Sequence, residues 1–166
     1  MKIKLTLIII LSFISLVKAQ EKNGEIALSK NVVLEWKTEK FIPEKHKIET
    51  CKTEFGDKYI CKIDGELWLG SDNGMENPRN QLTKLSLKIN SQSIKLDVSN
   101  IFNASFDGEL SNRRFSFKKE GEFYRLYSFF SDGAGAYTVI WKVLDNRSIR
   151  EVISNDERYF DWQKKK

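Results

Sequence analysis

The 166-residue sequence has one histidine, two cysteines and two prolines, and these scarcities exclude several classes of protein. A Ser-His-Asp hydrolase needs a histidine base, but His46 lies in the lysine-rich stretch 44–47, where we expect it to face solvent. A structural zinc site needs more ligands than His46 and two cysteines supply. No Gly-x-Ser-x-Gly motif or phosphate-binding glycine loop is present. We therefore predict a protein without enzymatic activity, catalytic residues, metal or cofactor.

Two chemical alternatives stay open because they need only acidic or amide side chains. Glycoside hydrolysis requires two carboxylates placed across a sugar, and the sequence does not show which acids pair. Residues 71–77 are rich in oxygen ligands that suit calcium, but their glycine is not where an EF-hand loop needs it. The same Asp, Asn and Gly residues are typical of turns.

The N-terminal residues predict export. Lys2 and Lys4 precede an apolar run over 5–17, and the run ends in the sequence Val17-Lys18-Ala19. This is the pattern of a signal peptide over residues 1–19, and the run is short for a membrane span. Its removal takes away three lysines and lowers the formal charge from +5 to +2, which does not favour a nucleic-acid partner. We expect a periplasmic or extracellular protein with no integral membrane segment after cleavage.

The rest of the chain has no linker and little helical character. Aromatic and β-branched residues are frequent, alanine is rare, and apolar and polar residues alternate over 32–37, 82–89 and 93–98. Asp64-Gly65 is a hairpin-turn signal. We predict an N-terminal arm over 20–30 and one all-β domain over 31–166. Its fold is an antiparallel sandwich or barrel of about nine or ten short strands, with one short helix over 156–163.

Cys51 and Cys61 are predicted to form a disulfide. Both lie after the predicted signal peptide and would be exported to an oxidising compartment, where a single pair of cysteines usually forms a disulfide. Gly56 lies midway between them, so a hairpin symmetric about this glycine would place the two cysteines opposite each other. A redox pair would have the shorter Cys-x-x-Cys spacing.

Two Ser-Asp loops are the candidate binding sites. One follows Trp68 and contains Asp72 and Asn73, and the other covers 131–137. In the second loop, glycines allow close backbone approach, an acid supplies a charged acceptor and a tyrosine offers a rigid anchor with a hydrated hydroxyl. The predicted binding residues are Ser131, Asp132, Gly133, Gly135, Tyr137, Asp72 and Asn73. The alternative is a tight turn packed under a neighbouring strand.

The segments 64–72, 82–98 and 130–150 together resemble small secreted bacterial β-domains that have no established activity. The Ser-Asp-Gly-Ala-Gly-Ala-Tyr sequence at 131–137 is also similar to the loop that periplasmic lysozyme inhibitors insert into an enzyme's cleft. This resemblance is a few residues long and implies insertion of the loop into a protein partner.

These observations favour a non-enzymatic protein-binding domain of the inhibitor or immunity type. The alternative is a glycan- or cell-envelope-binding module, in which exposed Trp68, Trp141 or Trp162 would stack on sugar rings. Trp36 and Trp141 lie in apolar alternation, which is typical of core residues. A flat aromatic platform would favour sugar, and a protruding loop of small residues would favour a protein cleft.

Overall fold

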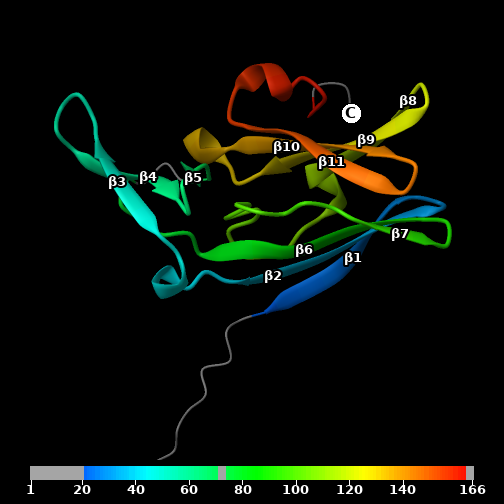
Figure 1. The fold of residues 1–166 in the computed structure, drawn as a ribbon, viewed down its shortest axis with the longest axis horizontal. Coiled ribbons are helices and arrows are strands. Elements are labelled where there is room, and N and C mark those ends of the chain that lie inside the picture. Colours follow the sequence, from blue (N-terminus) through cyan, green and yellow to red (C-terminus); the bar gives the residue numbers. More distant parts are fainter. Residues whose placement is uncertain (1–20, 71–73, 164–166) are drawn as a thin grey trace, which may run out of the picture.

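A computed structural model of the chain describes residues 21–70 and 74–163. Eleven strands in these ranges form three separate antiparallel sheets that do not close into one barrel (Figure 1). The arrangement is consistent with a β-sandwich, and the all-β prediction is confirmed. The signal peptide predicted over 1–19 lies outside the described residues.

Two four-stranded sheets make up the two layers. The first sheet has the order β1-β2-β6-β7. Its strands are β1 (Lys22–Ser29), β2 (Val32–Lys40), β6 (Asn80–Ile89) and β7 (Gln92–Lys95). The second sheet has the order β11-β10-β9-β8. Its strands are β8 (Phe115–Glu120), β9 (Phe123–Phe130), β10 (Tyr137–Leu144) and β11 (Arg147–Ser154).

A third, three-stranded sheet, here called the small sheet, is inserted between β2 and β6. It consists of β3 (Ile48–Lys52), β4 (Lys58–Ile63) and β5 (Glu66–Leu67). In Figure 1 its β3–β4 hairpin extends beyond one end of the two larger sheets. The predicted Asp64-Gly65 turn joins β4 to β5, with both residues at positive φ.

The main core lies between the two large sheets. Alternation along the strands sends apolar side chains inward, so Leu34, Leu87 and Leu126 are fully buried. Trp141 is also fully buried, and its indole Nε1 donates to the carbonyl of Asp97 at 2.8 Å. Trp36 is buried as well, and the prediction that Trp36 and Trp141 are core residues is confirmed.

The edges of the two sheets are joined by side chains. On β11, the Ser148 hydroxyl donates to the carbonyl of Lys95 on β7 at 2.7 Å. Arg150, also on β11, pairs with Asp97 at 3.4 Å and donates to the carbonyl of Ser99. These contacts hold the irregular segment after β7 against the second sheet.

The N-terminal arm expected over 20–30 is instead the edge strand β1. Gly24 lies opposite Trp36 of β2, and a Cβ at Gly24 would approach the Trp36 Cζ2 atom to 2.9 Å. The indole therefore covers the glycine, and Ile26 enters the main core. This added strand is one reason that the structure exceeds the predicted nine or ten strands.

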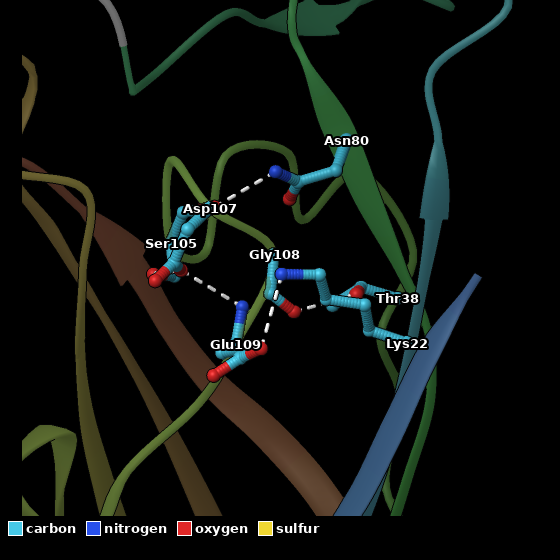
Figure 2. A network of polar contacts seen from close by, with 7 residues as sticks. All are labelled: Lys22, Thr38, Asn80, Ser105, Asp107, Gly108 and Glu109. Carbon is cyan, nitrogen blue, oxygen red and sulfur yellow. Dashed lines mark hydrogen bonds and ion pairs between the residues drawn. The ribbon is translucent and has the colours of Figure 1, made fainter. Parts of the chain in front are cut away.

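A polar network fastens the connection between β7 and β8 to the first sheet. The Thr38 hydroxyl donates to the Gly108 carbonyl at 2.7 Å, and the Asn80 amide donates to the Ser105 carbonyl at 2.7 Å. Hydrogen bonds from the Ser105 hydroxyl and from the backbone of Glu109 lower the pKa of Asp107. Figure 2 shows the whole network: Lys22, Thr38, Asn80, Ser105, Asp107, Gly108 and Glu109.

In place of the helix expected over 156–163, the structure has a 3-10 turn at Glu157–Tyr159. The Asp156 carboxylate accepts from the backbone N–H of Arg158 at 3.0 Å and caps this turn. The Arg158 side chain also donates to this carboxylate, and this contact, with the backbone hydrogen bond, lowers the pKa of Asp156 to about 2. A segment this short forms a 3-10 turn more readily than an α-helix, because a short α-helix makes too few hydrogen bonds to offset the free-energy cost of nucleation.

Candidate functional site

The two Ser-Asp loops that the sequence singles out meet in the structure. The Ser131 hydroxyl, at the end of β9, donates to the carbonyl of Gly70 at 3.1 Å. The Asn103 amide donates to the same carbonyl at 3.1 Å. Gly70 has a φ of +101°, and a Cβ there would lie 3.1 Å from the Phe102 carbonyl, so this position requires glycine. Asp72 and Asn73 lie outside the described residues.

The second loop divides into a buried base and an exposed tip. Ser131, Gly135 and Tyr137 are buried, whereas Asp132, Gly133 and Ala134 are exposed. The tip is a single 3-10 turn, Gly133–Gly135. Of the residues predicted to bind in this loop, only Asp132 and Gly133 are accessible.

Tyr137 was expected to be an anchor with a hydrated hydroxyl, and the structure corrects this expectation. Its hydroxyl donates to the Phe102 carbonyl at 2.6 Å inside the protein. Burial holds the pKa of Tyr137 well above its usual value. The side chain therefore supports the loop from within and does not reach solvent.

The small sheet has one buried and one exposed face. Ile60 and Ile63 pack on Phe41 and Phe102 in a second hydrophobic cluster, joined by the half-buried Trp68. The strand register places Leu67 opposite Lys62 and Tyr59 opposite Cys51, on the face away from this cluster.

Large apolar side chains are exposed on and beside this outer face. Phe55, at the tip of the β3–β4 hairpin, is 84% exposed, and Leu67 on β5 is 67% exposed. Tyr59 and Met75 are also exposed. The backbone of Gly74, next to Met75, accepts a hydrogen bond from Ile60 at 2.8 Å, which brings this segment alongside β4.

The predicted disulfide between Cys51 and Cys61 is present, with its Cα atoms 5.7 Å apart. The disulfide joins β3 to β4 as predicted, but the two cysteines do not lie directly opposite each other, and this part of the prediction is wrong. Cys51 lies opposite Tyr59, and Cys61 is the extra residue of a β-bulge. The disulfide braces the hairpin that carries Phe55.

His46 is not the solvated side chain that its lysine-rich neighbours suggested. Only 14% of its side chain is exposed, and its Nδ1 lies 2.7 Å from Oδ2 of Asp64. Its ring stacks on Phe41 with a centroid distance of 4.4 Å. The hydrogen bond with His46 is the main cause that lowers the pKa of Asp64. The pair joins the β2–β3 connection to the β4–β5 turn.

The tryptophans do not form an exposed platform. Trp36, Trp141 and Trp162 are buried, and Trp68 is half-buried against Phe102 with ring centroids 5.9 Å apart. The expectation that Trp141 or Trp162 is exposed for stacking on sugar is therefore wrong. In the described ranges, no three His, Cys, Asp or Glu residues are grouped to hold a metal ion.

The chain matches no protein-family model, no curated protein and no solved structure. No helix within 21–70 or 74–163 has the length and apolar character to cross a membrane.

Proposed function

We propose that this chain is an exported, non-enzymatic domain that binds a protein partner, of the inhibitor or immunity type. The observation that carries the proposal is the exposure of four large apolar side chains, Phe55, Tyr59, Leu67 and Met75, on and beside the small sheet. Exposed apolar patches on a folded domain mark interaction surfaces, and aromatic side chains supply much of the energy of such contacts.

The small sheet is suited to binding because it is held in place before a partner arrives. The disulfide closes its hairpin, and its buried face packs on Phe41 and Phe102. A rigid surface loses little conformational entropy on association, so more of its contact energy remains as affinity.

The tip of the second loop adds a charge beside this apolar surface. Gly70 comes shortly after Leu67 and Trp68 in the chain, and its carbonyl accepts a hydrogen bond from the Ser131 hydroxyl. The exposed Asp132 is the residue after Ser131. The partner that fits offers an apolar pocket with a basic group at its border, because a carboxylate at a contact rim selects an opposite charge.

The predicted signal peptide and the disulfide support an exported location, since disulfides persist in oxidising compartments. A role without catalysis is supported by the position of the only histidine. The Nδ1 atom of His46 forms a hydrogen bond with the Asp64 carboxylate, and the His46 ring is packed against Phe41. Both contacts brace the small sheet.

A comparison of two matched surface variants tests the proposal. The mature domain serves as bait in the medium and periplasm of its own organism, and the retained protein is then purified. Phe55→Ser with Leu67→Ser should weaken its affinity for the domain by about 2–4 kcal/mol, because both side chains would lie in the contact. Isothermal titration calorimetry measures the difference.

The control is Leu144→Ser with Ile149→Ser, on β10 and β11. Ile149 is 66% exposed, which matches Leu67, and Leu144 is 41% exposed, so this variant also removes exposed apolar surface but away from the small sheet. The control should bind as the wild type does. Equal affinity of the wild type and both variants, or no retained protein at all, would contradict the proposal.

A further inference from the structure

A pocket of about 480 Å³ lies on the outer face of the second sheet, apart from the small sheet. Strands β8 to β11 form its floor, and the C-terminal segment around Trp162 forms one wall. Figure 1 shows this segment lying over β10 and β11 on the side away from the first sheet. A pocket of this size can enclose a small molecule or one unit of a polymer.

A fixed polar array occupies the floor. Arg125 donates to Glu120 at 2.6 Å and to Glu151 at 2.9 Å, and the Tyr127 hydroxyl donates to Glu120 at 2.6 Å. The guanidinium is charged at any ordinary pH, and the hydrogen bond with Glu151 raises the pKa of Arg125 further. Such an array presents donors and acceptors in set positions, which is what a ligand with several hydroxyl groups requires.

An apolar wall stands beside this array. The Tyr127 ring lies 6.0 Å from the Trp162 ring, and Tyr159 is exposed at the rim. Ile140 and Val152 complete the apolar part of the lining. Flat rings next to fixed polar groups suit a ligand with an apolar C–H face and a polar edge.

The charges of the lining cancel. The acids are Glu120, Glu151 and Asp161, and the bases are Lys118, Arg125 and Arg158. A pocket with no net charge gains little from an ionic ligand, because the ligand would lose hydration without a matching countercharge.

The geometry points to a binding site for a neutral saccharide unit in this pocket. Sugar hydroxyls exchange hydrogen bonds with Glu151 and Arg125, and the C–H face of the ring lies against Tyr159. This site does not depend on the small sheet, so the domain has two separate binding surfaces.

Calorimetric titration of the mature domain with four neutral trisaccharides tests the site. The probes are chitotriose, maltotriose, cellotriose and mannotriose. At least one should bind, and Glu151→Gln and Tyr159→Ala should each weaken that binding about tenfold. The matched control is Glu35→Gln on the first sheet, where the carboxylate pairs with Lys84 and Lys88. It should leave the affinity unchanged.

A second measurement does not depend on how the variants fold. Amide resonances of the wild-type domain should shift on addition of the bound trisaccharide in β8 to β11 and at 157–162, and not in the small sheet. No binding of any probe at about 10 mM overturns the inference. Shifts confined to other strands, or equal weakening in Glu35→Gln, overturn it as well.

Discussion

The two large sheets and the small sheet are stabilised in different ways. Among the described residues, nineteen buried side chains form the core between the large sheets, and four form the cluster under the small sheet. The small sheet has in addition a disulfide and the His46–Asp64 contact. Where few apolar side chains can be buried, covalent and polar links hold the strands, as they do in small domains generally.

The side chain of Tyr137 connects the two regions. Tyr137 belongs to the core of the large sheets, but its hydroxyl donates to the carbonyl of Phe102, which belongs to the smaller cluster. The position of the small sheet therefore depends on the larger core. Substitutions can separate what each region contributes to stability.

Tyr137→Ala should have the largest effect. It removes a fully buried ring and leaves the Phe102 carbonyl without its donor, so the free energy of unfolding should fall by about 3–5 kcal/mol. Urea unfolding followed by tryptophan fluorescence measures this change.

Asp132→Ala is the control from the same loop, since Asp132 is exposed at the tip. It should change the free energy of unfolding by no more than about 0.5 kcal/mol. Similar stabilities of the two variants would contradict the division of this loop into a buried base and an exposed tip.

Removal of the disulfide should have a smaller and more local effect. Cys51→Ala with Cys61→Ala releases a short loop, and the chain-entropy model assigns it about 2–3 kcal/mol. Hydrogen exchange of the amides in β3 and β4 should accelerate accordingly, because this hairpin opens without the large sheets.

The amides of β9 and β10 serve as the internal reference in that experiment. Their exchange should stay close to that of the wild type, since their protection comes from the main core. Equal acceleration in both regions would show that the small sheet and the sandwich unfold as one unit.

The sequence predicted the strands wherever a regular alternation or a turn motif was present. The alternation over 82–89 became β6, and Asp64-Gly65 became the β4–β5 turn. Strand β1 was missed because it contains Gly24, a residue that weakens strands. Its place in the sheet depends on Trp36 of the neighbouring strand, which covers the glycine. Such a contact between strands leaves no local signal.

The candidate sites were harder to predict for the same reason. Burial of Tyr137 depends on Phe102, which is 35 residues away in the sequence. The hydrogen-bond partner of His46 is Asp64. The sequence predicted Asp64 as a turn residue but gave no sign of its contact with His46. The residues of the polar pocket come from four strands and the C-terminal segment, with no characteristic spacing. The disulfide was predictable because two cysteines have only one intramolecular pairing.

The smallest expected effect is on the pKa of Asp64 and so on stability at acidic pH. The hydrogen bond from His46 lowers the pKa of Asp64 below its usual 3.8 in the folded protein. This contact therefore stabilises the small sheet fully above pH 3.8, and the stabilisation is lost as the pH falls through the folded pKa. Carbon-13 NMR should show the Asp64 carboxyl titrating below 3.8 in the wild type and closer to 3.8 in His46→Ala. The backbone N–H of Lys47 still donates to Asp64 at 2.8 Å, so some lowering of the pKa should remain. Identical titration in both proteins would show that His46 does not brace this turn.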